Sequence, residues 1–316
     1  MTAQSRTSWI NFTALILVNL LWAAQYPAYK IAGDNMGAAA LNFWVLMFGM
    51  LLLTPFWLRE KRKPKKELRT SFWKRFGEFV LLGVVGIVPP SVLLSWGISH
   101  SSASNAAILS LTIPVLMTGL GCVMLGEKLT AIRIACLLFG LIGTLLVSMS
   151  DLTQFSLSRA LLMGNSVLLI AGLGSAFYNT YSKALLSRYS ELKVLIYSYL
   201  TAAGACAIIS AIFESKPFYV VTGYSKATWM VIFVIGVFPW GLAMVIWMWV
   251  LNRLEVGQIS TSIYLLPLFG LVFSAITIHD HIGTPQILGG VLTVAGTAIL
   301  TLYEGRQGNK LEYGSN

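Results

Sequence analysis

Charged side chains are scarce in this chain of 316 residues. Asp, Glu, Lys and Arg make up 11% of it and hydrophobic residues 56%, whereas a typical soluble domain carries about 25% charged residues. This composition excludes a disordered chain, a coiled coil and an ordinary soluble enzyme. It indicates an integral membrane protein of the all-α class.

Cysteine and histidine are also rare, at three each. Cys122, Cys136 and Cys206 all lie in apolar runs, so neither a disulfide framework nor a cysteine-based zinc motif is expected. The run 279–281 (His-Asp-His) has no further His or Cys at a metal-binding spacing, and we expect a turn or helix cap there instead of a metal site. The sequence predicts no cofactor, and it lacks the motifs of an intramembrane enzyme.

Ten stretches approach the roughly 20 apolar residues that a membrane-spanning helix needs. They are 10–31, 38–58, 79–98, 103–125, 131–149, 161–183, 194–213, 228–250, 257–278 and 285–303. The first is too long for the core of a signal peptide, so we expect it to be retained. The polar tail 304–316 resembles an expression-vector remnant and is left out of the functional argument.

No carboxylate falls in the middle of a predicted span, where it would normally mark ion or proton chemistry. Most of the 22 Lys and Arg, including the cluster in 59–75, fall on one side when the gaps are numbered alternately. The positive-inside rule then places both termini in the cytoplasm. We interpret the cluster as a topogenic loop, with lipid headgroups as the alternative contact, and expect no nucleic-acid partner.

The two halves of the chain match at a constant offset of 153 residues. The matched pairs are Lys30 with Lys183, Trp96 with Trp249, Pro114 with Pro267, Glu127 with Asp280 and Gly143 with Gly296, while Pro89 matches Pro239 at an offset of 150. Each half, 10–149 and 161–303, holds five predicted spans. Because five is odd, the repeats are predicted to be inverted, a frequent design of secondary transporters with the substrate site between the halves.

Three motifs resemble a known family: residues 20–30 (LLWAAQYPAYK), the run 101–107 (SSASNAA) and the turn 126–130 (GEKLT) before a glycine-spaced fifth span. In these the chain resembles the ten-span EamA-type branch of the drug/metabolite transporter superfamily, over about residues 12–303. Within that branch it most resembles the YddG-type amino-acid exporters. It departs from the pattern at Asp280, where the family has Glu. The resemblance implies a multi-pass transporter of a bacterial inner (plasma) membrane.

The first span has a polar face that we expect to line a cavity. Asn19, Trp22 and Tyr26 follow one another at three- and four-residue spacing and therefore share a face. An unsatisfied amide is costly in lipid, so this face should look into the protein or into water. The matching sixth span offers Ser175, Tyr178 and Asn179. The alternative is hydrogen bonding between helices without a ligand.

Two aromatic residues and two lysines complete the candidate site. Trp240 and Tyr264 lie near the middle of the eighth and ninth spans and are expected to form walls of an apolar pocket, or else simple core packing. Lys30 and Lys183 lie at matching span ends, where they could contact an anion at each gate. Snorkelling to the headgroups is the alternative for both lysines.

Four prolines near the middle of symmetric spans are candidate hinges. A proline removes an internal hydrogen bond and kinks a helix, although membrane helices also tolerate proline as a static kink. These four are Pro89, Pro114, Pro239 and Pro267.

The expected function is secondary transport of small neutral or zwitterionic metabolites, with amino acids, including aromatic ones, implied by the resemblance. An organic-cation antiporter usually needs a buried carboxylate, and a phosphorylated-metabolite antiporter needs several cavity Lys or Arg; both remain alternatives within the same fold. No filter-like motif points to a channel. The expected partners are a small-molecule substrate and membrane lipid. The sequence leaves the oligomeric state open, and a monomer is compatible with it.

Overall fold

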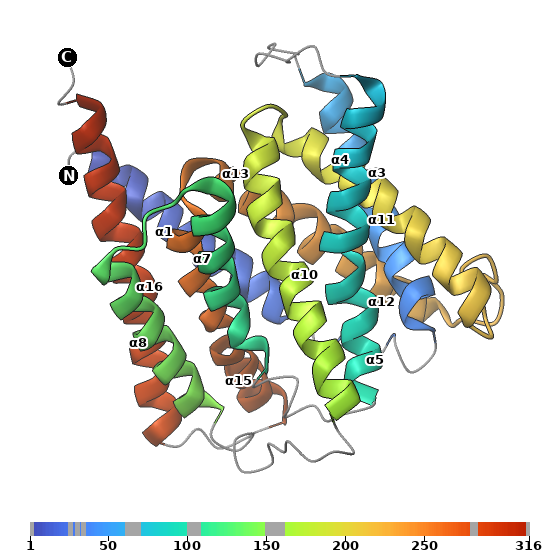
Figure 1. Ribbon diagram of the computed structural model, residues 1–316. Helices are drawn as coiled ribbons and strands as arrows, with labels where there is room; N and C mark the ends of the chain where they lie inside the picture. The colour runs from blue at the N-terminus through green and yellow to red at the C-terminus, as the bar shows by residue number, and fades with distance from the viewer. Residues whose placement is uncertain are drawn as a thin grey trace.

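Helices are the only regular secondary structure in the described part of the chain, here a computed structural model (Figure 1). The structure describes residues 3–24, 28, 32, 36–60, 71–99, 109–148, 162–278 and 284–313. Within these ranges there is no strand, which agrees with the predicted all-α class.

Several consecutive helices join into one span. The first half holds α1 (Ala3–Ala23), α3 (Ala38–Arg59), α4 (Phe72–Gly86) continued by the π-helix η1 (Pro89–Leu93) and by α5 (Leu94–Ser99), α7 (Thr112–Leu125) and α8 (Ala131–Val147). The second half holds α10 (Leu162–Leu186), α11 (Glu191–Phe213), α12 (Lys226–Val237) continued by the π-helix η3 (Phe238–Ala243) and by α13 (Met244–Arg253), α14 (Val256–Ser260) continued by the 3₁₀-helix η4 (Thr261–Tyr264) and by α15 (Leu265–Ile278), and α16 (Thr284–Tyr313).

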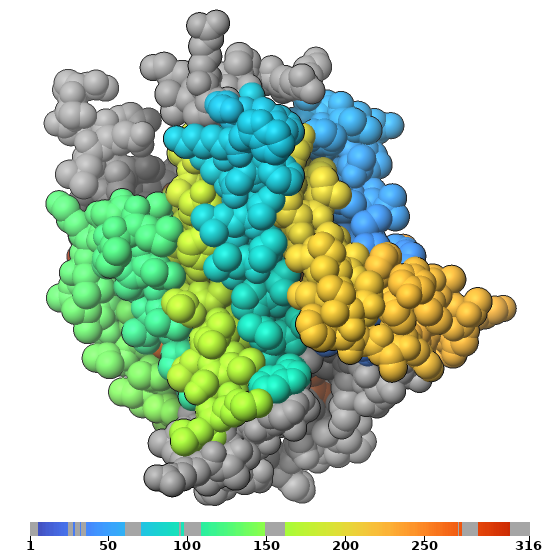
Figure 2. Space-filling view, turned by 45° about the vertical axis from the view of Figure 1, so that its right-hand side comes forward, coloured from blue at the N-terminus to red at the C-terminus, as the bar shows by residue number. Residues whose placement is uncertain are grey.

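Five described segments are long and apolar enough to cross a membrane: Ala38–Arg59, Phe72–Leu93, Glu191–Phe213, Lys226–Arg253 and Thr284–Tyr303. The outer faces of the helices are apolar as well, since Val123 and Phe213 expose 84% and 78% of their surface. On the face seen in Figure 2, α10, α4 and α11 lie side by side. Helices that are apolar both inside and outside the bundle suit a lipid environment.

The observed helix ends differ from the predicted spans most clearly in three helices, and α1 also ends at Ala23, before the predicted end at residue 31. α1 already begins at Ala3, and α16 runs on to Tyr313 through the polar tail, where no proline interrupts it. α4 begins at Phe72 instead of residue 79, so Glu78 lies inside a helix and not in a gap. That position is tolerated because Arg188 donates to the Glu78 carboxylate at 2.7 Å.

Two helix pairs on opposite sides of the bundle make the most extensive contacts, α8 with α16 and α3 with α11 (Figure 1). Between them, α10 packs on α7 and on the α4–η1–α5 span, and α1 packs on α15 and α13. Both chain termini lie at one end of the bundle, together with the turn from α7 to α8 (Figure 1). We call this the termini end.

The closest helix contacts recur at the 153-residue offset. A Cβ placed at Gly83 of α4 would lie 2.6 Å from the carbonyl oxygen of Ser198 in α11. A Cβ placed at Gly236 of α12 would lie 2.8 Å from the carbonyl oxygen of Val45 in α3. Gly83 matches Gly236 and Val45 matches Ser198, so these two crossings are equivalent in the sequence repeat.

The α8–α16 crossing repeats in the same way. A Cβ at Gly143 would lie 2.6 Å from the carbonyl oxygen of Gly289, and a Cβ at Gly296 would lie 3.0 Å from that of Cys136. Gly143 matches Gly296, and Cys136 matches Gly289. Small residues therefore bring the backbones together at both ends of this pair, as is typical of helix packing in membranes.

Candidate functional site

An aromatic and polar cluster lies where α1, α10 and α13 meet. The Trp247 indole N–H donates to Oδ1 of Asn179 at 2.6 Å, and the Asn179 amide donates to the Ser175 carbonyl oxygen at 2.8 Å. The Trp22 ring packs on the Trp247 ring, with centroids 5.0 Å apart. We call Trp22, Asn179 and Trp247 the Trp247 cluster. It joins one helix from the first half to two from the second.

A buried polar side chain near this cluster has an atom without a hydrogen-bond partner. Asn19 lies about one turn before Trp22 and is fully buried; its Nδ2 donates to the Leu15 carbonyl oxygen at 2.8 Å, but its Oδ1 has no donor. On α10, the Tyr178 hydroxyl lies close to the hydroxyls of Ser182 and of Ser198 in α11. An unmet buried acceptor costs about 1–3 kcal/mol, so the Asn19 Oδ1 atom calls for an explanation.

Tyr264 and Trp240 serve helix packing in this conformation. The Tyr264 hydroxyl donates to the Leu111 carbonyl oxygen at 3.3 Å, and the ring, 1% exposed, covers Gly140 of α8. The Trp240 carbonyl oxygen accepts from the Tyr199 hydroxyl at 2.6 Å. Their assignment to a pocket wall remains a prediction.

All four predicted hinge prolines lie at or beside a break in helical geometry. Pro89 lies in η1 and Pro239 in η3, so matching spans contain a π-turn at matching places. Pro114 follows a turn at Leu111, and Pro267 follows the 3₁₀-helix η4. π-Turns are rare inside α-helices and are frequent at functional sites. Their role as hinges remains a prediction.

A polar clasp joins α7, α8 and α14 at the termini end. The Glu127 carboxylate accepts from the backbone N–H groups of Val256 and Gly257, at 2.7 and 2.8 Å, and so caps α14. Arg133, 4% exposed, is ion-paired with Glu255 and donates to the Lys128 carbonyl oxygen at 2.8 Å. We call Glu127, Arg133 and Glu255 the termini-end clasp. A carboxylate at a helix N-terminus is stabilised by the helix dipole.

Lys183 caps a helix as well. Its ammonium donates to the carbonyl oxygens of Leu251 and Asn252, at 2.7 and 3.2 Å, at the end of α13. A cation at a helix C-terminus satisfies orphan carbonyls and the helix dipole together. Lys30 and Tyr26 lie outside the described residues, as do Asp280 and the run 101–107.

Sequence analysis missed two features of this site. Trp247 was not predicted, because the π-helix η3 lies between Trp240 and Trp247 and shifts the helix register, so their seven-residue spacing does not indicate a shared face. The unmet acceptor on Asn19 has no sequence signature, because it depends on how α1 is rotated against its neighbours.

The comparisons with known proteins agree with this architecture. The model of the EamA-like transporter family matches residues 9–149 and 162–302. A solved crystal structure superposes with a TM-score of 0.77 and 16% sequence identity, covering 94% of this chain and 98% of the other chain. At this identity the similarity shows the fold alone.

Two curated relatives are similar over nearly their full length. "Uncharacterized transporter YoaV" of Bacillus subtilis is 25% identical over 89% of this chain and 93% of its own. The "Probable terminal-alkyne amino-acid exporter" of Streptantibioticus cattleyicolor is 26% identical over 91% and 92%. Because the family model covers both halves of the chain, this protein belongs to the EamA-like transporter family of membrane transporters and is not an enzyme.

Proposed function

We propose that this protein exports amino acids, aromatic ones among them, across the inner (plasma) membrane of a bacterial cell. The observation that carries the proposal is the neutral Trp247 cluster with the buried, unmet Asn19 Oδ1 about one helical turn from Trp22. Indole rings suit an apolar side chain, and a free amide oxygen can accept from an ammonium group. A relative whose name is that of a probable amino-acid exporter supports the substrate class.

The mechanism in this proposal is alternating access between two inverted repeats, residues 10–149 and 161–303. The contacts that recur at an offset of 153 support two similar folds packed around a central site. With both termini in the cytoplasm, the termini-end clasp closes the cytoplasmic side. The π-turns η1 and η3 then supply the bends at which each half opens.

The charge of the site favours a zwitterion over an organic cation. Asn19, Trp22, Asn179 and Trp247 are all neutral, and a cation would need a buried carboxylate that the cluster does not hold. A zwitterion needs hydrogen bonds and helix-end dipoles instead of a full countercharge.

Counterflow in proteoliposomes tests the proposal. Vesicles loaded with unlabelled phenylalanine, methionine or threonine should take up a labelled amino acid with saturation, and the same three compounds should compete from outside. Repeating the uptake with and without a pH gradient establishes whether protons are coupled. If no amino acid moves while a cationic dye or another metabolite does, the substrate assignment is wrong although the transporter class stands.

A further inference from the structure

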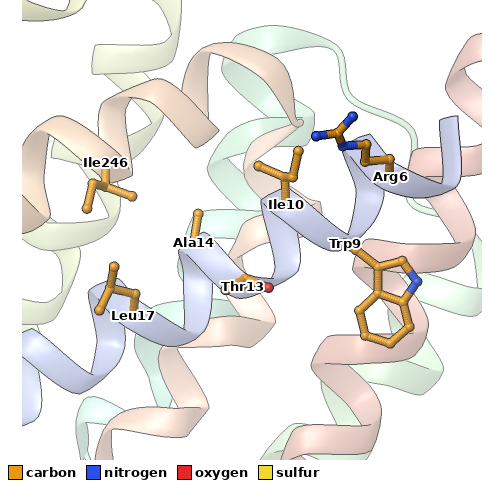
Figure 3. A pocket seen from close by; sticks show the side chains of 7 residues that line it. All are labelled: Arg6, Trp9, Ile10, Thr13, Ala14, Leu17 and Ile246. Carbon is orange, nitrogen blue, oxygen red and sulfur yellow. The ribbon is translucent and has the colours of Figure 1, made fainter. Parts of the chain in front are cut away.

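A groove runs along the outer side of α1, beside α13 (Figure 3). It is a shallow, open groove of about 470 Å³, and its lining is almost wholly apolar. Arg6, Ile10, Ala14 and Leu17 follow one stripe of α1, at spacings of four, four and three residues, and Ile246 of α13 faces the inner end of the stripe. The described neighbours leave the stripe open, because Ile10 and Leu17 are 47% and 42% exposed.

The length of the groove is close to the thickness of one membrane leaflet. Arg6 and Leu17 are eleven residues apart, which is about 16 Å along a helix. The hydrocarbon core of a bilayer is about 30 Å thick, so one leaflet contributes about 15 Å. Because α1 runs obliquely through the bundle (Figure 1), a groove that starts at the termini end extends through part of one leaflet.

The groove has a charge at its outer end only. Arg6 is exposed and is the single ionisable residue of the lining. A guanidinium binds phosphate through paired N–H donors. A cation at the membrane surface above a 16 Å apolar stripe is complementary to a phosphate ester that carries an acyl chain.

We propose that this groove binds one anionic phospholipid from the leaflet at the termini end. Arg6 binds the phosphate, and one acyl chain lies over Ile10, Ala14 and Leu17 against Ile246. A bound lipid would thus support the α1–α13 contact. This proposal rests on the membrane location and not on the amino-acid substrate.

Native mass spectrometry of the purified full chain tests it, with phosphatidylglycerol and phosphatidylcholine as the added lipids. We expect one tightly held phosphatidylglycerol, bound in preference to phosphatidylcholine. Arg6→Gln should reduce that preference about fivefold, the effect of one basic residue near an anionic surface, whereas Arg6→Lys should keep most of it. Lys74→Gln, an exposed basic residue of α4, is the matched control and should change nothing.

A second variant distinguishes lipid binding in the groove from lipid attraction by the general surface charge. Ala14→Trp should fill the stripe and remove the tightly held lipid, while Ile208→Trp, on the outward face of α11 and 63% exposed, should keep it. Elution as a single sharp peak in size-exclusion chromatography reports that each variant is folded. A lipid that Ala14→Trp still holds, or equal losses in Arg6→Gln and Lys74→Gln, would overturn the proposal.

Discussion

Trp247 contacts both halves of the candidate site. Its ring is fully buried, packs on Trp22 of the first half and donates to Asn179 of the second. Replacing it therefore affects both the hydrogen bond and the ring contact.

Trp247→Phe should weaken both stability and transport. The phenyl ring keeps most of the contact with Trp22 but leaves Oδ1 of Asn179 buried without a donor, at a cost of about 1–3 kcal/mol. Thermal unfolding in detergent and counterflow in proteoliposomes measure the two effects. Trp73→Phe, at a ring that is 74% exposed, is the control and should match the wild type. Wild-type behaviour of Trp247→Phe in both assays would contradict the assignment.

Asn19→Leu should separate stability from transport. The substitution removes a buried acceptor that has no donor, so the melting temperature should stay level or rise. Counterflow should fall at least tenfold, because the proposed contact with the substrate ammonium is lost. A stabilised protein with unchanged flux would show that the unmet oxygen does not serve the substrate. A large loss of stability would show that Asn19 is a packing residue.

At the scale of helices, the residues of the termini-end clasp should contribute unequally to the free energy of unfolding. Glu127 is 6% exposed in its side chain and holds two N–H groups of α14, whereas the side chain of Glu255 is 48% exposed. Glu127→Gln should lower the free energy of unfolding by about 1–3 kcal/mol. Glu255→Gln should cost at most about 1 kcal/mol, as for exposed ion pairs. Thermal unfolding of both variants checks this order, and the reverse order would refute it.

The α8–α16 crossing depends on the absence of a side chain at Gly143. An added methyl group would meet the Gly289 backbone oxygen at 2.6 Å and Thr293 Oγ1 at 2.5 Å. Gly143→Ala should therefore destabilise the fold by about 1–3 kcal/mol. Gly119→Ala, where nothing lies within 4 Å of the new atom, should be neutral or stabilising because alanine favours helix. Equal melting temperatures of the two variants would mean that the crossing relaxes freely.

Some features of the helices could be predicted from the sequence and others could not. Hydropathy identifies the spans because lipid requires about 20 apolar residues in a row. It misses the start of α4, since residues 72–78 are helical but include the charged Lys74, Arg75 and Glu78. The prolines locate the breaks in the helices, but not the π-turns of η1 and η3, because the new hydrogen-bond register depends on packing against neighbours. For the same reason the partners of Trp247 and Asn19 could not be predicted.

At the scale of the whole molecule, the transporter class is confirmed by the family match over both halves. The candidate site residues and the repeat boundaries remain predictions. The two sets of predictions are related through the repeat symmetry of the chain. Contacts such as Gly83 with Ser198 and Gly236 with Val45 recur at an offset of 153 residues. A symmetric pair of half-sites is the physical basis for two alternating gates, and it requires that the two halves run through the membrane in opposite directions.

That requirement gives a direct test of topology. Trp73 and Lys226 are exposed, lie at the starts of α4 and α12, and are separated by the repeat offset of 153 residues. In inverted repeats, matching positions face opposite sides of the membrane. The three native cysteines are free, so single cysteines can be introduced after these are changed to alanine.

Lys226→Cys should react with a membrane-impermeant maleimide on intact cells, whereas Trp73→Cys should react only after the cells are permeabilised. The physical reason is the odd number of spans between the two sites, which follows from five spans per repeat. Labelling of both cysteines from the same side would require an even number of spans between them. The repeats would then be parallel, and alternating access through two equivalent gates would lose its structural basis.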